Sequence, residues 1–454
     1  MIGESALSAQ PDIAAGRLSQ AEYARNFDDI KRPLTPQQAP IDASRCYFCY
    51  DAPCIEACPT GIDIPSFIRK IASDNIRGAA MDILGANIFG GACARVCPVE
   101  ELCEEACVRT AQEGKPVNIG LLQRYATDRF FERGEQPFER AAPTGKRIAV
   151  AGGGPAGMSC AHGLARLGYE VTVYEARAKA GGLNEYGIAA YKVIDDFAQR
   201  ELDFILSVGG ITLEFNKALG ADISLAGLRR DYDAVFLATG QAGVKALEVE
   251  GQALEGVRPA IDYIAELRQA GDLAALPVGR RVVVIGGGNT AIDIAVQTKR
   301  LGAEDVTICY RRGPEEMGAT WHEQEVAQTS GVRIKHWVRP VRLHGANGHV
   351  GSIELEYTKL GDDGRLAGTG DTTTLPADSV FTAIGQILIA DPVADGAGEP
   401  LDIQGGRIVV NEELQTSLPG VFAGGDCIAG LDLTVQAVED GKVAARSIHR
   451  YLTR

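Results

Sequence analysis

The sequence lacks a long apolar run and an excess of basic residues. Its best apolar stretch, from Val282 to Ile294, is interrupted by three glycines, by Asn289 and by Asp293, so we expect no membrane-spanning helix. The formal net charge of −15 argues against nucleic acid or an anionic membrane as the main partner, because both require a basic face. The first residues, MIGESALSAQPDIAAGR, have neither the basic region nor the apolar core of a signal peptide. We therefore expect a cytoplasmic protein.

Histidine is also scarce, and three of the cysteines stand alone. The six histidines form no metal-binding or catalytic-triad pattern. Cys160, Cys309 and Cys427 have no partner at C-x-x-C spacing, which excludes a redox-active dithiol of the usual kind. We expect these three cysteines in the core or in strands.

The length of 454 residues predicts two or three domains. A cysteine-rich helical zone is followed by a polar linker, Glu132 to Lys146, and then by a strand, glycine turn, helix and strand pattern that occurs twice. We expect an α/β fold with two Rossmann-like dinucleotide-binding domains, one inserted in the other, preceded by an α-helical iron–sulfur domain. The expected bounds are 1–140 for the helical domain, 144–264 and 378–454 for the first dinucleotide domain, and 265–377 for the second.

Eight of the eleven cysteines lie in two groups, Cys46-x2-Cys49-x4-Cys54-x3-Cys58-Pro59 and Cys93-x3-Cys97-Pro98-x5-Cys103-x3-Cys107. In a reducing compartment, such crowding indicates metal ligation rather than disulfides. Thiolates suit zinc or iron–sulfur clusters. Structural zinc usually shows paired C-x2-C knuckles, which the second group lacks. The recurring cysteine–proline pairs are typical of ferredoxin-type runs, so iron–sulfur clusters are favoured.

The same region resembles a known family. The segments CYFCYDAPCIEACPTGIDIPSFI, GGACARVCPVEELCEEACVR and VNIGLLQRYATD are similar to the N-terminal region of dihydropyrimidine dehydrogenases and, less closely, to the small subunit of bacterial glutamate synthase. The resemblance implies two 4Fe-4S clusters whose ligands interleave between the two cysteine groups. One cluster would be held by Cys46, Cys49, Cys54 and Cys107, and the other by Cys58, Cys97, Cys103 and Gln123.

The assignment of Gln123 as a ligand comes from the resemblance alone. By itself, Gln123 is an ordinary surface glutamine of a helix expected from Ile119 to Phe131. In that case Cys93, and not Gln123, is the fourth ligand of the second cluster. If Gln123 is the ligand, Cys93 binds no metal.

The first glycine turn follows the strand RIAVA and precedes a helix. It fits G-x-G-x-x-G, in which the glycines permit the tight turn, the close approach of a pyrophosphate and close helix–strand packing. The helix N-terminus supplies N–H groups for the phosphates. Glu175 ends the second strand, where a carboxylate can accept hydrogen bonds from ribose hydroxyls. The expected contacts here are Gly152, Gly154, Pro155, Ala156, Gly157 and Glu175.

A segment near the C-terminus points to FAD as the ligand of this turn. The sequence TSLPGVFAGGDC ends just after Asp426 and resembles the second FAD motif of two-dinucleotide flavoproteins, in which the aspartate binds the ribityl chain. The next helix would direct its N-terminus, around Thr434, towards the pyrimidine edge of the flavin. Its dipole would there stabilise the negative charge of the reduced flavin. The resemblance implies further FAD contacts from Gly182, Leu183, Lys192 and Gly425.

The second glycine turn has the form G-x-G-x-x-A, in which alanine still packs closely. It predicts a nicotinamide-cofactor site. The strand that ends in Ala383-Ile384-Gly385 is a linking segment expected of such folds. The expected contacts are Gly286, Gly287, Gly288, Asn289, Thr290, Arg311, Arg312, Ala383 and Gly385.

The residues and the resemblance favour different nicotinamide cofactors. Arg311 and Arg312 stand where an NAD site would present an acid, and they could clasp the 2′-phosphate of NADP. Alternatively, Arg311 stacks on adenine and Arg312 is solvated. Animal dihydropyrimidine dehydrogenases, which use NADPH, carry a further arginine at about the position of Gly318, whereas the two-chain bacterial relatives are NAD-linked. We therefore expect NADH.

The cluster zone and the two dinucleotide domains leave no stretch for a substrate domain. Flavin accepts a hydride and can release electrons singly, and iron–sulfur clusters carry one electron each. We therefore expect an NAD(P)-dependent oxidoreductase that passes electrons to another polypeptide.

The resemblance implies the electron-input subunit of a bacterial dihydropyrimidine dehydrogenase. Its partner would be an FMN-containing subunit with further iron–sulfur clusters that reduces uracil or thymine to the 5,6-dihydro compound. We expect a hetero-oligomer with two copies of each chain, in which residues 1–131 are buried against the partner. The alternatives are the small subunit of glutamate synthase and a pure electron-carrier module with an inactive nicotinamide site.

Overall fold

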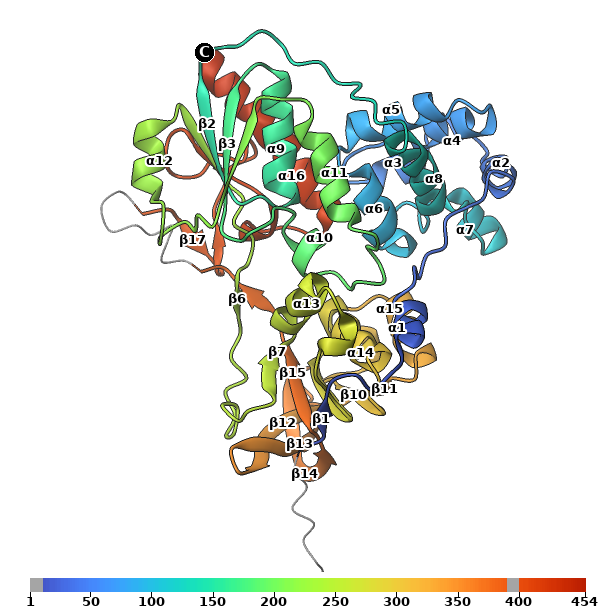
Figure 1. The fold of residues 1–454 in the computed structure, drawn as a ribbon, viewed down its shortest axis with the longest axis vertical. Coiled ribbons are helices and arrows are strands. Elements are labelled where there is room, and N and C mark those ends of the chain that lie inside the picture. The colour runs from blue at the N-terminus through green and yellow to red at the C-terminus, as the bar shows by residue number, and fades with distance from the viewer. Residues whose placement is uncertain (1–10, 390–399) are drawn as a thin grey trace, which may run out of the picture. The chain divides into compact units, whose positions relative to one another are not determined.

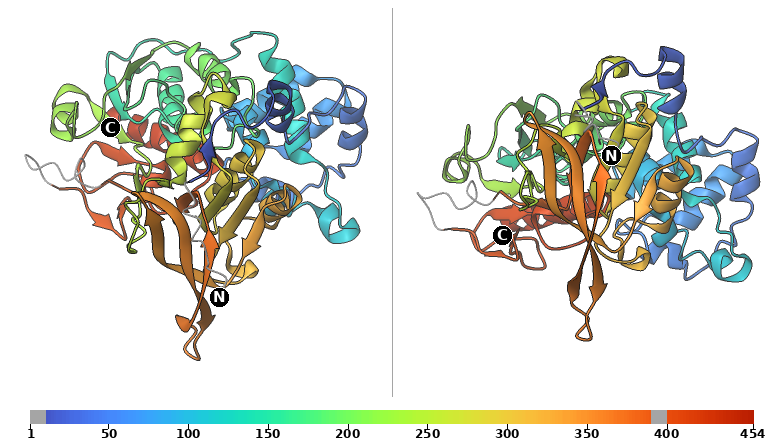
Figure 2. Two further views of the ribbon diagram at one scale, coloured as in Figure 1. Left: turned by 60° about the horizontal axis from the view of Figure 1, so that its bottom comes forward. Right: turned by 90° about the horizontal axis from the view of Figure 1, so that it is seen from below.

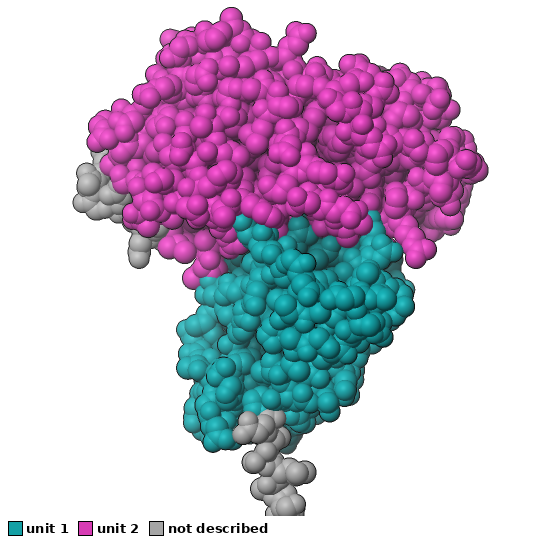
Figure 3. All heavy atoms as spheres, in the orientation of Figure 1, with its two compact units in different colours: residues 1–29, 186–191, 244–386 teal, residues 30–185, 192–243, 387–454 magenta. Residues whose placement is uncertain are grey.

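A computed structural model describes residues 11–389 and 400–454 of the chain. They form two compact units that alternate along the sequence (Figure 3). Unit 1 contains the described residues up to 29 together with 186–191 and 244–386, and unit 2 contains 30–185, 192–243 and the described residues from 387 onwards. The main segment of unit 1, 244–386, is therefore inserted in unit 2, in agreement with the predicted fold class, whereas the described residues up to 29 precede unit 2 in the sequence.

Unit 2 contains a five-stranded parallel sheet with the strand order β19-β5-β2-β3-β4. The first strand, β2, covers the predicted segment RIAVA, and its residues from Ile148 to Ala151 are buried, as expected for a central parallel strand. The strands are β2 (Arg147–Ala151), β3 (Glu170–Glu175), β4 (Ile211–Phe215), β5 (Ala234–Leu237) and β19 (Val421–Ala423).

Helices cover both faces of this sheet (Figure 1). Helix α12 packs on the strands through Leu225 and Leu228. On the other side, α9 and α16 approach closely because small residues meet between them: a Cβ on Gly441 would lie 2.2 Å from the backbone oxygen of Ala156. The helices are α9 (Pro155–Arg166), α10 (Leu183–Tyr186), α11 (Phe197–Leu206), α12 (Leu225–Asp231) and α16 (Thr434–Thr453).

The cysteine region of unit 2 is built from short helices around its own core. One face of α4 is apolar, and its residues Ile64, Phe67, Ile68 and Ile71 are all buried. The predicted helix from Ile119 to Phe131 is α8. The helices are α2 (Gln38–Ala43), α3 (Pro53–Glu56), α4 (Ile64–Ala72), α5 (Ile76–Ala86), α6 (Gly90–Val96), α7 (Val108–Glu113) and α8 (Ile119–Phe131).

Unit 1 contains a second parallel sheet with the order β11-β10-β9-β15-β7. Two strands of this sheet, β7 and β15, lie outside the expected range 265–377 in the sequence. The elements are β7 (Val257–Pro259), α13 (Ala260–Gln269), β9 (Arg281–Gly286), α14 (Asn289–Arg300), β10 (Asp305–Cys309), α15 (Trp321–Thr329), β11 (Arg333–Lys335) and β15 (Ser379–Ala383).

Two further features belong to unit 1. A three-stranded antiparallel sheet, formed by β12 (Val338–Ala346), β13 (His349–Leu360) and β14 (Leu366–Pro376), ends in a long hairpin (Figure 2). Near the N-terminus, β1 (Ile13–Ala14) pairs with β8 (Val278–Gly279), and α1 (Gln20–Asn26) follows it. None of the described helices is long and apolar enough to cross a membrane.

Candidate functional site

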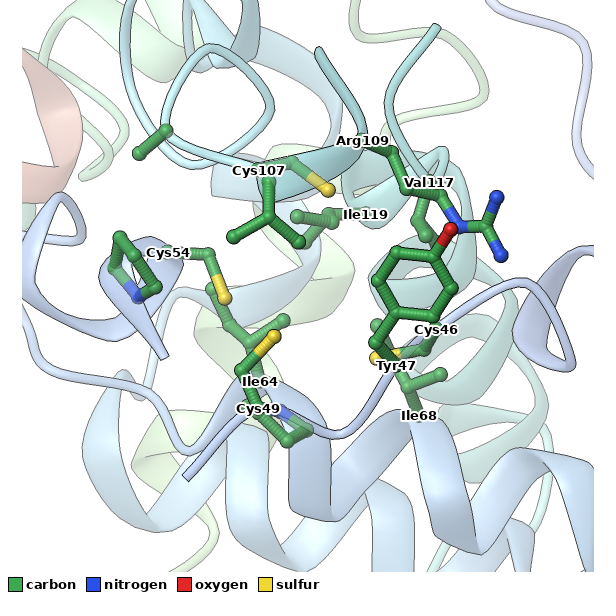
Figure 4. A pocket seen from close by; sticks show the side chains of 14 residues that line it. Cys46, Tyr47, Cys49, Cys54, Ile64, Ile68, Cys107, Arg109, Val117 and Ile119 are labelled. Carbon is green, nitrogen blue, oxygen red and sulfur yellow. The ribbon is translucent and has the colours of Figure 1, made fainter. Parts of the chain in front are cut away.

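One pocket of unit 2 is lined by four of the expected cluster ligands, Cys46, Cys49, Cys54 and Cys107. Cys54 lies in α3 and Cys107 immediately precedes α7. Figure 4 shows their sulfur atoms around a shared space, which is also lined by apolar side chains that include Ile64 and Ile119. The structure therefore brings together residues that are up to 61 positions apart in the sequence.

The rim of this first pocket carries a cation beside an aromatic ring. The Arg109 guanidinium carbon lies 4.0 Å from the centre of the Tyr47 ring (Figure 4). Burial, together with the neighbouring thiols of Cys107 and Cys46, raises the pKa of the Cys54 thiol to about 12. Thiolates here would be poorly solvated and would repel one another, so the pocket is suited to a soft cationic centre that binds several of them.

A second pocket of unit 2 is lined by Cys58, Cys97 and Cys103, and by both candidates for the fourth ligand, Cys93 and Gln123. Each of these fourth-ligand candidates is buried. The pocket combines the end of the first cysteine group with α6 and α8. The second cysteine group is thus divided between the two pockets, with Cys107 in the first.

Two thiols of the second pocket, those of Cys97 and Cys103, also resist ionisation without a cation. The pKa of Cys97 is raised first by its hydrogen bond with the Cys93 side chain and then by burial. Burial and the neighbouring Glu104 carboxylate raise the pKa of Cys103. A positive metal centre would reverse these shifts, because it binds the thiolate form.

The donor geometry fits iron–sulfur clusters better than single zinc ions. Zinc takes four ligands at about 2.3 Å from one point. Among residues 11–389 and 400–454, no three histidine, cysteine or carboxylate side chains lie close enough together to share one metal ion. Instead, the thiols of each pocket surround about 380 Å³ of atom-free space, part of it open to solvent. A 4Fe-4S cluster takes its four ligands from such a wider ring.

The first glycine turn lies at the end of β2 in unit 2. Gly152 has φ 112°, and a Cβ there would lie 2.2 Å from the carbonyl oxygen of Ala238, so no larger residue fits. Helix α9 begins after Gly154 with Pro155 at its first turn and has no side-chain cap. Its N-terminal N–H groups are therefore available to phosphate oxygens.

Glu175 stands beside this turn at the end of β3. Its carboxylate accepts hydrogen bonds from the backbone N–H groups of Gly153 and Arg177, both at 2.9 Å. The glutamate is buried. It is thus fixed against the turn by two amides.

The C-terminal FAD motif lies against the same turn. A Cβ on Gly425 would lie 2.9 Å from the Ala156 Cβ, which places the residue before Asp426 at the start of α9. Burial, together with the like charge of Asp432, raises the pKa of the Asp426 carboxyl to about 6. The Thr434 hydroxyl at the start of α16 lies 3.0 Å from the side-chain oxygen of Asn184.

Two other expected FAD contacts lie in the loop after β3. The N–H of Gly181 donates to the Gly153 carbonyl at 2.8 Å, so Gly182 lies next to the first turn. Leu183 begins α10 and is 38% exposed. Lys192 is partly buried in the segment where the chain returns to unit 2.

The second glycine turn, in unit 1, repeats the geometry of the first. Gly286 has φ 147°, and a Cβ there would lie 2.2 Å from the carbonyl oxygen of Ala383, the last residue of β15. Helix α14 begins at Asn289 without a side-chain cap. The N–H of Ala319 donates to the Gly287 carbonyl at 2.8 Å and holds a neighbouring loop over the turn.

Arg311 and Arg312, which are expected to bind the adenosine end of the nicotinamide cofactor, are exposed. Their backbone is fixed, because the Arg311 carbonyl accepts from the Thr358 hydroxyl at 2.8 Å and the Arg312 carbonyl accepts from the Trp337 N–H at 3.1 Å. The guanidinium groups can therefore reach a phosphate or an adenine from an anchored loop. Gly385 follows β15 in the same unit.

Two ionisable residues that the sequence did not single out join the dinucleotide part of unit 2 to its cysteine region. Glu201 of α11 accepts from the N–H groups of Gly91 and Ala92, at 2.8 and 3.0 Å. Lys442 of α16 donates to carbonyl groups of the cysteine region. Glu201 shares the buried face of α11 with apolar side chains. A carboxylate on an apolar helical face is the one sequence signal that could have revealed it.

Comparison with known proteins identifies both parts of the chain. Residues 23–135 match the family described as dihydropyrimidine dehydrogenase domain II, 4Fe-4S cluster, and residues 146–441 match the pyridine nucleotide-disulphide oxidoreductase family. The NAD-dependent dihydropyrimidine dehydrogenase subunit PreT of Salmonella typhimurium is 34% identical over 427 residues, which cover 94% of this chain and 97% of the relative.

Two further likenesses complete the comparison. The glutamate synthase (NADPH) small chain of Escherichia coli is 35% identical over 447 residues, covering 94% of each chain. Thioredoxin reductase of Lactococcus lactis shares the fold, with a TM-score of 0.54 at 22% identity over 68% of this chain and 99% of that one. The chain belongs to the pyridine nucleotide-disulphide oxidoreductase family and, with its N-terminal 4Fe-4S domain, is an NAD(P)H-dependent iron–sulfur flavoprotein that acts as an electron-transfer subunit.

Proposed function

We propose that this chain is the electron-input subunit of a bacterial dihydropyrimidine dehydrogenase. It takes electrons from NADH and passes them through FAD and two 4Fe-4S clusters. The acceptor is an FMN- and iron–sulfur-containing partner, which reduces uracil or thymine to the 5,6-dihydro compound. The expected assembly contains two copies of each chain and belongs in the cytoplasm, where thiols stay reduced.

The observation that carries the proposal is the position of helix α16. Its first turn includes Thr434, which is assigned to the flavin, and Val435 lines the second cysteine pocket. One helix thus connects the proposed FAD site to a proposed cluster site within unit 2. This arrangement supports one-electron transfer out of the flavin.

The two cysteine pockets support the ligand assignment. In the first, Cys46, Cys49, Cys54 and Cys107 hold one 4Fe-4S cluster. In the second, the ligands are Cys58, Cys97, Cys103 and Gln123. We retain the domain bounds 1–140, 144–264, 265–377 and 378–454 as the proposed functional division of the chain.

The protein's own groups bind and orient the cofactors. Bound FAD supplies the chemistry that converts a hydride into single electrons. The amides at the start of α9 hold the FAD pyrophosphate, Glu175 the ribose and Asp426 the ribityl chain. The N-terminus of α16 places positive dipole charge where reduced flavin is negative. In unit 1, the amides at the start of α14 hold the nicotinamide dinucleotide, with Arg311 and Arg312 at its adenosine end.

The small subunit of glutamate synthase is the second candidate, because a glutamate synthase small chain is 35% identical over 94% of this chain. The DAPC and CPTGIDIP segments favour the pyrimidine enzyme. A pure electron carrier with an inactive nicotinamide site is opposed by the second glycine turn. Absence of NADH-dependent dye reduction would support that reading.

Anaerobic co-purification with the native partner tests the proposal. The isolated complex should be yellow-brown, contain FAD and iron, and oxidise NADH in the presence of uracil or thymine. Turnover with glutamine and 2-oxoglutarate, and none with pyrimidines, would assign the chain to glutamate synthase instead. A colourless protein that holds zinc and no flavin would refute both assignments.

A further inference from the structure

Lys442 ties the C-terminal helix α16 to two separate segments of the cysteine region. Its ammonium group donates to the backbone carbonyls of Thr60 and Ala86, each at 2.9 Å. Thr60 follows shortly after Cys58, and Ala86 is the last residue of α5. A cation is favourable at the C-terminal end of a helix, where carbonyl groups are left unpaired. One side chain thus holds both segments against α16.

Thr60 connects this cation to an expected cluster ligand. The Thr60 side chain is buried, and its hydroxyl oxygen lies 3.3 Å from the Cys58 sulfur. Cys58 lines the second pocket. The ammonium group therefore contacts the Thr60 carbonyl directly and is linked to the Cys58 sulfur through the hydroxyl of the same residue.

The same face of α16 also forms part of the pocket wall. Val435, which lines the pocket, precedes Lys442 by seven residues, or two helical turns, so both side chains lie on one face. Thr434 beside Val435 contacts Asn184 of α10, which follows Leu183, a residue assigned to the flavin. The position of the helix relative to the second pocket therefore depends on the anchor that Lys442 provides.

The charge of Lys442 matters as well as its position. Each electron that enters a 4Fe-4S cluster adds one negative charge, which a nearby cation stabilises. Glu439 pairs with Lys442 at 2.5 Å, and the two side chains are 22% and 21% exposed. Loss of Lys442 alone would remove the cation and leave the carboxylate unbalanced, and both changes disfavour the reduced cluster.

We propose that Lys442 is a positioning residue for electron transfer, which holds the second cluster site against helix α16 and raises the reduction potential of the cluster bound there. This inference rests on the proposed function, because it requires FAD and a cluster at these two sites. The hydrogen bonds of Lys442 go to the backbone carbonyls of Thr60 and Ala86, which are not proposed cofactor ligands. It acts through the 58–60 segment and through the helix.

The test compares full-length Lys442→Met with the wild-type protein, both purified anaerobically. We expect FAD content and the rate of flavin reduction by NADH to be unchanged. One of the two cluster midpoint potentials, measured by EPR-monitored titration, should fall, and the following reduction of the clusters should slow several-fold in stopped-flow absorbance. Thr60→Val should lower the same potential by a smaller amount, since it removes only the hydroxyl contact to Cys58.

Three further variants separate position from charge. Lys442→Arg keeps the cation and should restore most of the potential. Lys442→Met combined with Glu439→Gln should recover part of the potential but not the rate, because the anchor is still absent. Lys70→Met removes a lysine that pairs with Asp82 at 2.6 Å within the cysteine region and contacts neither pocket, and it should change neither quantity.

Each outcome decides a different question. Wild-type protein without FAD, or with only one cluster, would contradict the proposed function. Two clusters in both proteins, with unchanged potentials and rates in Lys442→Met, would overturn the inference alone. Loss of iron in Lys442→Met would support the positioning role if Lys442→Arg restores it, and would count against the role if Lys70→Met loses iron equally.

Discussion

The side-chain amide of Gln123 donates a hydrogen bond to the backbone carbonyl of Gly90 at 2.6 Å. Because the nitrogen is used in this bond, the amide oxygen is the atom left for the second pocket, which Gln123 lines. Cys93 lines the same pocket and hydrogen-bonds to Cys97. The two residues are rival candidates for one ligand position.

Separate substitution of these two residues distinguishes them. We expect Gln123→Ala to lose or alter one cluster, with iron falling from about eight towards about four atoms per chain. Cys93→Ala should keep the iron content, because the thiol is then only a neighbour of Cys97. Iron analysis and EPR of the reduced proteins measure both effects. Retained iron in Gln123→Ala, together with loss in Cys93→Ala, would assign the position to the cysteine.

FAD affinity should depend on pH through Asp426. Its carboxyl pKa is raised to about 6 by burial and by Asp432, and only the carboxylate form accepts hydrogen bonds fully from the ribityl hydroxyls. Binding therefore favours the ionised form, and affinity should fall as pH drops below about 6, at most about tenfold per unit. Flavin fluorescence titration of the apoprotein between pH 5 and 8 measures this.

The control for this prediction is Asp426→Asn. The variant should bind FAD more weakly, and its affinity should vary less with pH, because the amide does not titrate in this range. If the wild-type and variant proteins show the same pH dependence, another group is responsible. The role of Asp426 in FAD binding would then be withdrawn.

Cofactor preference can be tested at Gly318. A Cβ there would lie 3.9 Å from the Gly288 Cα and 4.0 Å from the Gly287 oxygen, so a larger side chain fits beside the second turn. Gly318→Arg should add a charge-assisted contact to a 2′-phosphate and raise kcat/KM for NADPH by about tenfold or more. Gly271→Arg, in open space elsewhere in unit 1, is the matched control. A strong NADPH preference in the wild-type protein would overturn the expected use of NADH.

Local patterns in the sequence predicted the secondary structure around the sites well. The strand RIAVA is β2, and the helix expected from Ile119 to Phe131 is α8 with those bounds. Glycine turns and helical periodicity depend on neighbouring residues, and steric limits on the backbone fix them locally. Such features can be read from one sequence.

Contacts between distant segments could not be predicted in the same way. Spacing within the cysteine groups does not reveal that Cys107 shares a pocket with Cys46 while Cys103 lies in the other pocket, and only the family resemblance supplied that grouping. Lys442 donates hydrogen bonds to Thr60 and Ala86, which are 382 and 356 positions away in the sequence. A lysine in an amphipathic helix has the same local pattern whether it is solvated or anchored.

The stability of the protein should fall with rising pH because of Glu201. This carboxyl is fully buried, and burial raises its pKa from 4.5 to about 8, although the N–H groups of Ala92 and Gly91 and the charge of Arg95 act in the opposite direction. The folded state then holds a proton that the unfolded state has released between about pH 4.5 and 8. The stabilisation is therefore complete below the unfolded pKa and is lost as the pH rises through the folded pKa, by a few kcal/mol in total.

Glu201→Gln removes this dependence while keeping one oxygen for the amides of α6. The variant should match the wild-type protein near pH 5 and be relatively more stable near pH 9, where the wild-type carboxylate must be buried with its charge. Anaerobic thermal unfolding at a fixed heating rate measures the difference, with the exposed Glu325→Gln as control. If the two pH profiles remain parallel from pH 5 to 9, Glu201 is ionised in the folded protein throughout this range, because the Arg95 charge and the two amide bonds then outweigh its desolvation.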